Sequence, residues 1–115
     1  EIAMKLNHLN LIVTDVAATC AFFEKYFGLK TQWANEASAF LKDDNELLLA
    51  LFERTAAAYP DGFHIGFMQE SRERVNEIHQ HLVDDGFKIK PPREFHGSWT
   101  FYFRGPEDFL IEVLC

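Results

Sequence analysis

The chain repeats one pattern of residues twice, and this duplication constrains the fold more than any other feature of the sequence. The hexapeptide LNHLNL near the start aligns with GFHIGF near the middle, so that His8 and His64 occupy equivalent positions. The fold is therefore expected to contain two similar halves, formed by the internal repeats 5–53 and 62–115. At 115 residues the chain has the length of one domain, so we expect both repeats to belong to a single domain, residues 1–115.

The ends of the two repeats also align, and they differ at one informative position. Residues 41–50 match residues 103–112 without a gap, which makes Ala50 the counterpart of Glu112. The duplication thus marks four equivalent positions, and three of them carry side chains that bind metal ions. Two imidazoles and one carboxylate suit a divalent cation with open coordination positions.

Each repeat predicts the element order β-α-β-β-β. In the first repeat, alternation over residues 5–13 predicts a strand with His8 and Asn10 on one face. Asp15 is the expected N-cap of a helix over residues 16–27, which Gly28 ends. Three further strands are predicted at residues 30–35, 37–42 and 47–52.

The second repeat predicts the same order of elements after a linker over residues 54–61. A helix is expected over residues 72–85, with Ser71 as its N-cap and Gly86 as its end. Strands are expected at residues 63–68, 87–90, 99–104 and 109–114. The predicted fold class is therefore α+β, with two β-α-β-β-β modules.

Charge and cysteine content exclude several classes of function. The net charge of −7 argues against a nucleic-acid groove and against binding to an anionic membrane surface, because both need clustered Lys and Arg. Two cysteines provide no disulfide framework, which favours a cytoplasmic location. The sequence contains no run of 18 apolar residues, so no membrane-spanning helix is predicted.

Glu112 requires a partner, because apolar residues occupy both faces of its predicted strand. An uncompensated carboxylate in such a place costs several kcal/mol. A salt bridge to Lys or Arg, or an edge position that reaches solvent, is one explanation, and a metal ion is the other. Taken alone, each of His8 and His64 is more often explained as a half-buried histidine with satisfied hydrogen bonds than as a metal ligand. Their equivalent positions, together with Glu112, favour a shared metal site.

The chain resembles the vicinal oxygen chelate superfamily, which includes glyoxalase I, extradiol dioxygenases, fosfomycin-thiol transferases, methylmalonyl-CoA epimerases and bleomycin-binding proteins. The resemblance lies in residues 6–15 (LNHLNLIVTD), residues 22–29 (FFEKYFGL) and residues 101–112 (FYFRGPEDFLIE), and it covers essentially the whole chain. It implies that the two modules form a cup-shaped mixed sheet with helices outside. It also implies that a divalent metal ion (Mn, Fe, Ni or Zn) binds in the cup to His8, His64 and Glu112.

The ligand set implied by this resemblance is similar to that of fosfomycin-thiol transferases and extradiol dioxygenases. Glyoxalase I and the epimerases usually carry Glu or Gln where this chain has Ala50. The resemblance therefore implies an enzyme that chelates a small-molecule substrate through vicinal oxygens. Fosfomycin itself is a poor candidate, because residues 91–92 are prolines where a lysine that grips the phosphonate is expected.

Three further residues are candidate catalytic groups. Thr100 and Tyr102 share strand parity and match positions where fosfomycin-thiol transferases place hydroxyl groups that contact the substrate. His96, in the loop before that strand, is a candidate base, and a solvated loop histidine is the alternative. His79, His81, Trp33 and Trp99 are expected to be structural, the two histidines facing water and the two tryptophans lying in the core.

Two other functions remain open at this stage. One is a metal-free protein of the bleomycin-resistance type that binds or sequesters a small molecule in the same cup. The other is a member that keeps the metal ligands without turnover. The resemblance also implies a homodimer, with the cup formed either within one chain or by modules of two chains.

Overall fold

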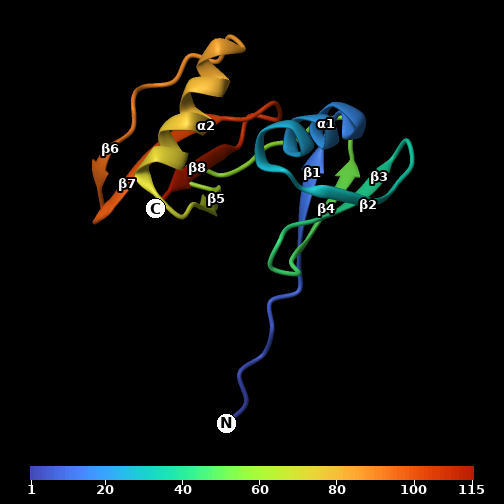
Figure 1. Ribbon diagram of the computed structural model, residues 1–115. Helices are drawn as coiled ribbons and strands as arrows, with labels where there is room; N and C mark the ends of the chain where they lie inside the picture. The colour runs from blue at the N-terminus through green and yellow to red at the C-terminus, as the bar shows by residue number, and fades with distance from the viewer. The chain divides into compact units, whose positions relative to one another are not determined.

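The computed structural model describes all of residues 1–115, which divide into two compact units. The first unit is Glu1–Ala57 and the second is Ala58–Cys115. Each unit contains one helix and one four-stranded mixed sheet (Figure 1). This confirms the α+β class and the two β-α-β-β-β modules.

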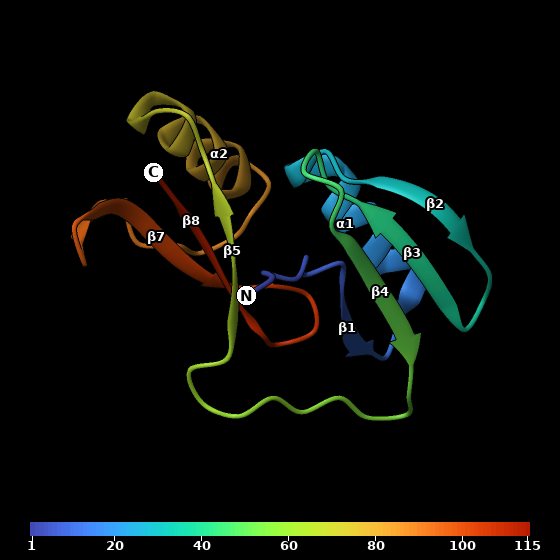
Figure 2. The ribbon, with the colours of Figure 1, turned by 90° about the horizontal axis from the view of Figure 1, so that it is seen from below.

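The first unit follows the predicted order of elements. Its elements are β1 (His8–Val13), α1 (Val16–Phe27), β2 (Lys30–Ala34), β3 (Ser38–Lys42) and β4 (Leu48–Glu53). The strands lie in the order β1-β4-β3-β2 (Figure 2), with β1 and β4 parallel and the other pairs antiparallel. β1 is therefore an edge strand of its sheet.

Helix α1 begins and ends at the residues that the sequence indicates. Asp15 is extended, and its carboxylate accepts a hydrogen bond from the amide of Ala18 at 2.9 Å. Gly28 adopts the left-handed conformation (φ 66°), and its amide donates to the carbonyls of Phe23 and Glu24. Both ends of the helix are thus fixed by local sequence.

The second unit repeats the arrangement of the first. Its elements are β5 (His64–Met68), α2 (Arg72–Asp84), β6 (Arg93–Phe95), β7 (Ser98–Arg104) and β8 (Leu110–Leu114). The strands lie in the order β5-β8-β7-β6, with β5 and β8 parallel. Ser71 caps α2 by accepting a hydrogen bond from the amide of Arg74.

The strand registers of the two units match residue by residue. His8 lies beside Leu48 in the first sheet, and His64 lies beside Leu110 in the second. Ala50 lies between Asn10 and Phe40, just as Glu112 lies between Gly66 and Tyr102. The registers thus place Ala50 and Glu112 at equivalent points, so the acidic group is present in one unit only.

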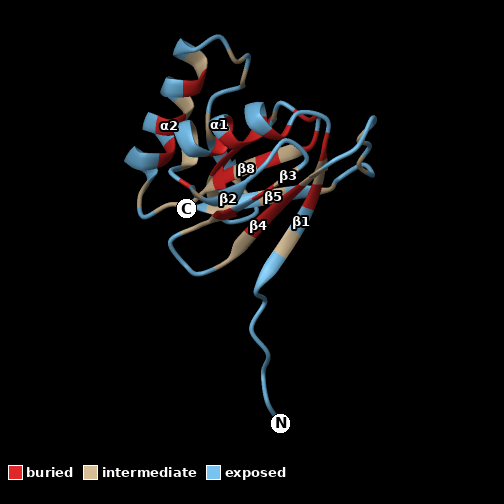
Figure 3. Ribbon diagram, turned by 90° about the vertical axis from the view of Figure 1, so that its right-hand side faces the viewer, coloured by how far each residue is buried: buried red, intermediate tan, exposed pale blue.

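Each unit has its own core on the face of its sheet that the helix covers. Buried residues alternate along β1, β3 and β8 and lie on the inner side of each helix (Figure 3). Leu11, Val13 and Phe23 are fully buried in the first unit, and Ile111 and Val113 in the second. The opposite faces of the sheets carry His8 and Asn10 in the first unit and Glu112 in the second.

One predicted strand is wrong. Residues 87–90 are not a strand, and the sheet instead gains the short β6 at Arg93–Phe95. Pro91 and Pro92 explain the difference, since proline has no N–H to donate and disfavours a regular conformation in the residue before it. The other predicted strands and helices occur within a few residues of their expected bounds.

Neither helix is long and apolar enough to cross a membrane. Both cysteines are free thiols, with Cys20 buried in α1. Burial is the main cause that raises the pKa of the Cys20 thiol. Because the thiol stays protonated, Cys20 acts as a core residue rather than as a nucleophile.

Candidate functional site

His64 and Glu112 meet on the face of the second sheet that α2 does not cover. His64 opens the edge strand β5, and Glu112 lies in the neighbouring strand β8. Nε2 of His64 is 3.6 Å from Oε1 of Glu112. The imidazole is 41% exposed and the carboxylate only 12%, so the pair opens to solvent on the histidine side.

A main-chain contact fixes the orientation of the His64 ring. Nδ1 of His64 is 2.9 Å from the carbonyl oxygen of Gly62, so Nδ1 carries the proton and donates it. In the neutral imidazole Nε2 is then the nitrogen with a free lone pair, and Nε2 faces Glu112. Histidines that ligate metals are commonly held in this way by a hydrogen bond from the second nitrogen.

Thr100 fixes the Glu112 carboxylate from the other side. Its hydroxyl is 2.7 Å from Oε2 of Glu112, to which it donates, and 3.1 Å from the carbonyl oxygen of Val113. The Thr100 side chain is fully buried, and it shares its sheet face with Glu112. Oε2 is therefore held by the protein, while Oε1 remains directed at His64. No Lys or Arg pairs with Glu112, so a salt bridge to either does not explain this partly buried acid.

Tyr102 lies directly across from Glu112 on β7 and packs edge-on against the His64 ring, with ring centroids 5.6 Å apart. Burial raises the pKa of the Tyr102 phenol, and hydrogen bonding to Glu112 and the negative charge of Glu112 raise it further. The nearby charge of Arg93 opposes this shift. The phenol thus stays protonated, and its single proton serves the hydrogen bond to Glu112.

His8 is the counterpart of His64 in the first unit. It is exposed at the start of β1, and its Nδ1 is 3.1 Å from Oδ1 of Asn7, which again leaves Nε2 free. Neither unit contains a group of three His, Cys, Asp or Glu side chains that could hold a metal ion. The structure brings His64 and Glu112 together, and the membership of His8 in their site stays a prediction.

His96 follows β6 in the chain and makes no hydrogen bond to His64 or Glu112. It occupies the hairpin turn between β6 and β7 in the left-handed conformation (φ 53°), and its ring centroid is 3.7 Å from that of Phe95. No hydrogen bond joins His96 to Thr100, Tyr102 or Glu112. Its role as a base stays a prediction.

Three residues differ from their expected roles. Trp99 is only partly buried rather than part of the core, and its indole N–H donates to Oδ1 of Asn76 on α2 at 2.9 Å. His79 does not face water: its Nε2 donates to the carbonyl of Ile89 at 3.2 Å, and its ring packs edge-on against Phe101. Trp33 is 48% exposed rather than part of the core, because β2 is an edge strand and its outer face has no covering helix. Gly62, whose carbonyl orients His64, had no signal in the sequence beyond its place before the strand.

The sequence of residues 5–113 matches the family described as the Glyoxalase/Bleomycin resistance protein/Dioxygenase superfamily. The chain belongs to this superfamily. This confirms the resemblance noted from the sequence. Comparison with curated protein sequences gives no significant match.

Solved structures show the same fold. A possible glyoxalase from Bacillus cereus is 45% identical with a TM-score of 0.92, covering 98% of this chain and 100% of that one. The fosfomycin resistance protein FosX from Listeria monocytogenes is 24% identical with a TM-score of 0.84, covering 98% and 93%. Lactoylglutathione lyase from Agrobacterium tumefaciens is 20% identical with a TM-score of 0.80, covering 99% and 95%. At these lower identities the likeness concerns the fold alone.

Proposed function

We propose that this protein is a metal-dependent enzyme whose ion is held by His8, His64 and Glu112. The observation that carries the proposal is the pairing of a free Nε2 of His64 with an oriented oxygen of Glu112. The donor set fits a divalent cation, since one carboxylate and neutral imidazoles are ordinary ligands for Mn, Fe, Ni or Zn. Another solved structure of the FosX protein contains Mn(II), which supports testing that ion.

The roles of the other residues follow from their contacts. When bound, the ion supplies Lewis-acid stabilisation of negative charge on a substrate oxygen. Thr100 holds the carboxylate so that one oxygen keeps its direction, and Gly62 holds the imidazole. Tyr102, whose phenol stays protonated, donates a hydrogen bond to a small-molecule substrate beside the pair in place of its hydrogen bond to Glu112.

The reaction proposed is of the glyoxalase or dioxygenase type, on a substrate that presents two neighbouring oxygens. Ala50 leaves the fourth equivalent position without a donor, which keeps coordination positions open for both oxygens. This three-donor set is the reason to place the enzyme nearer to fosfomycin-transferase-like or extradiol-dioxygenase-like chemistry. His96 is retained in this proposal as the candidate base.

A metal-free protein that binds or sequesters a small molecule is the second candidate. Exposed aromatic side chains on the first sheet favour it: Trp33 is 48% and Phe40 36% exposed, and their ring centroids are 5.6 Å apart. Such a surface suits a planar apolar ligand. This candidate predicts ligand binding that a chelator leaves unchanged.

A homodimer and a cytoplasmic location complete the proposal. β1 and β5, which carry the two histidines, are edge strands of their sheets, and open edges are places where copies of a chain associate. Two free thiols persist most readily in a reducing compartment.

Metal content of the purified protein tests the proposed function. We expect about one Mn, Fe, Ni or Zn ion per chain by elemental analysis, and its loss in His64→Ala and Glu112→Ala. His81→Ala is the matched control, since His81 is an exposed histidine on α2. Metal retained in His64→Ala and Glu112→Ala would rule out this site. A screen of hemithioacetals, catechols and epoxides then identifies the reaction.

A further inference from the structure

The two units differ most where their outer strands pair. In the first sheet, β2 follows β3 from Lys30 opposite Lys42 to Ala34 opposite Ala39. In the second sheet, β6 follows β7 only as far as Arg93 opposite Thr100. The prolines at positions 91 and 92 end the pairing there, so the rest of β7 has an open edge.

The main chain of this open edge presents hydrogen-bond donors. Trp99 exchanges two main-chain hydrogen bonds with Cys115, and Gly105 donates to Phe109, so odd-numbered residues of β7 face β8. By the alternation of an antiparallel strand, the N–H groups of Tyr102 and Arg104 point the other way, together with the carbonyl groups of the same two residues. They have no strand partner on that side.

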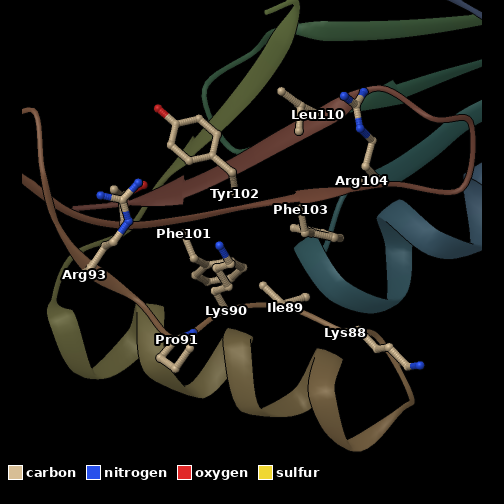
Figure 4. Close-up of a pocket in the computed structure, with 11 residues that line it drawn as sticks. Lys88, Ile89, Lys90, Pro91, Arg93, Phe101, Tyr102, Phe103, Arg104 and Leu110 are labelled. Carbon is tan, nitrogen blue, oxygen red and sulfur yellow. The ribbon is translucent and has the colours of Figure 1, made fainter.

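A cavity of about 340 Å³ lies along this edge, between β7 and the segment 88–91 (Figure 4). Four cationic side chains line it, and no acidic side chain does: Lys88, Lys90, Arg93 and Arg104. Lys90 and Arg93 make no ion pair, whereas Arg104 contacts Asp108. In Figure 4 the Lys88 amine turns away from the strand, which leaves Lys90 and Arg93 as the central charges.

This concentration of positive charge is unusual for the chain. The chain has a net charge of −7, and four of the six Lys and Arg residues in the second unit line this one cavity. The other two, Arg72 and Arg74, pair with Glu94 and Glu77 on the surface. Unpaired cations gathered beside free N–H groups are an arrangement that binds oxyanions.

The outer wall of the cavity is held in place. His79 donates to the carbonyl of Ile89 at 3.2 Å, and its ring packs against Phe101 at 5.2 Å between centroids. The segment that carries Lys90 is therefore anchored to α2, and Arg93 is braced by its position over the Phe95 ring. Both cations are presented on fixed backbone.

The cavity adjoins the His64–Glu112 pair. Thr100 and Tyr102 line the cavity, and the same two residues contact Glu112 or His64. A molecule with its anionic end in the cavity would thus extend past Tyr102 toward the pair. The cavity is of a size that accepts part of a small ligand.

We propose that this edge cavity binds the carboxylate or phosphate group of the substrate, through Lys90, Arg93 and the main-chain N–H groups of Tyr102 and Arg104. The substrate class is therefore a small oxyanion-bearing molecule whose neighbouring oxygens reach the His64–Glu112 pair. The assignment of the bound anion as part of the substrate rests on the proposed function. The anion site itself does not need the metal.

Titration of the metal-free, isotope-labelled full chain with anions tests the site. Inorganic phosphate and acetate are the two probes, each added at constant ionic strength, and they distinguish a phosphate from a carboxylate preference. We expect one probe to shift the amide resonances of Tyr102, Arg104 and residues 88–93. Arg93→Gln and Lys90→Gln should each weaken that binding about tenfold, as for loss of one charge-assisted hydrogen bond.

Arg74→Gln is the matched control, because Arg74 lies on α2 and is paired with Glu77. It should leave the affinity for the probe within about twofold of the wild type, since only screened surface charge is lost. Shifts spread over the whole surface, or equal affinity in Arg93→Gln and wild type, would overturn the anion site. His64→Ala should retain anion binding while losing metal, so failure of the metal site and failure of the anion site are separate results.

Discussion

At the scale of single residues, the two oxygens of the Glu112 carboxylate make different contacts. Oε2 accepts a hydrogen bond from the buried Thr100, and Oε1 faces Nε2 of His64. A carboxylate with one oxygen fixed in this way enters a coordination sphere with little loss of conformational freedom. Thr100 is therefore a positioning residue for a ligand rather than a ligand itself.

The substitution Thr100→Val tests this role, because it keeps the shape of the side chain and removes the donor. We expect the affinity for Mn(II), measured by calorimetry, to fall by about 10- to 100-fold, as is typical when an outer partner of a ligand is lost. Thr55→Val, in the exposed linker, is the control. An unchanged Mn(II) affinity in a folded Thr100→Val protein would show that Thr100 does not orient Glu112.

Tyr102 gives a pH dependence with a defined sign. Its phenol pKa is raised, so in the metal-free protein the phenolate should form above the ordinary value of about 10. The folded state then keeps a proton that the unfolded state loses, and stability falls as pH rises from about 10 through the raised pKa. Below that range the contribution is fully present.

The difference between the wild type and Tyr102→Phe isolates this contribution. Ultraviolet titration should show one phenolate appearing late in the wild type only, and Zn(II) should lower its pKa by compensating the charge of Glu112. A Tyr102 phenolate that forms at the ordinary pH in the metal-free protein would contradict the contact with Glu112.

How far the site could be predicted differs among its residues. The equivalence of His8 with His64 follows from the alignment of the two repeats, and the shared parity of Thr100 and Tyr102 follows from strand alternation, so both needed only the sequence. That Glu112 lies on the same face depends on the register of β7 with β8. The choice of Nε2 on His64 depends on the Gly62 carbonyl, and the direction of Oε1 depends on the Thr100 rotamer. Neither is encoded by a residue pattern.

At the scale of elements, helix α1 was predictable because its ends are set by local chemistry. Asp15 satisfies an amide of the first turn, and Gly28 adopts the left-handed conformation that ends the helix. The absence of a strand at residues 87–90 and the presence of β6 were not predictable, because hydrophobic alternation alone does not say whether a strand partner exists. The two prolines that follow residue 90 prevent strand pairing there despite the alternation.

Removal of the α1 cap should have a measurable cost. Asp15→Ala leaves the amide of Ala18 without its acceptor, and we expect a loss of about 1 kcal/mol in the free energy of unfolding by urea. Asp44→Ala, in the exposed turn between β3 and β4, is the matched control and should change stability by less than about 0.5 kcal/mol. Equal effects of the two substitutions would mean that Asp15 does not cap the helix.

At the scale of the whole molecule, the proposed metal ligands lie on two units that each have their own core. His8 lies on the first unit, and His64 and Glu112 lie on the second. A unit with a complete core has its packing satisfied internally. Its ligands are then available to a partner unit from the same chain or from another copy in the proposed homodimer.

A mixture of two inactive variants distinguishes these cases. His8→Ala and Glu112→Ala each remove one ligand, and we expect neither variant to bind Mn(II) alone. If the proposed homodimer builds each site from two chains, a mixed dimer pairs both defects in one site and leaves the other site intact. An equal mixture, unfolded and refolded together, should therefore regain about a quarter of the Mn(II) bound by the wild type, because half of the dimers are mixed and each mixed dimer has one intact site of two.

Glu112→Ala mixed with His64→Ala is the control, since these residues share a unit and no intact site can form. Mn(II) binding that stays absent in the first mixture, while the wild type binds it, would show that each site is completed within one chain.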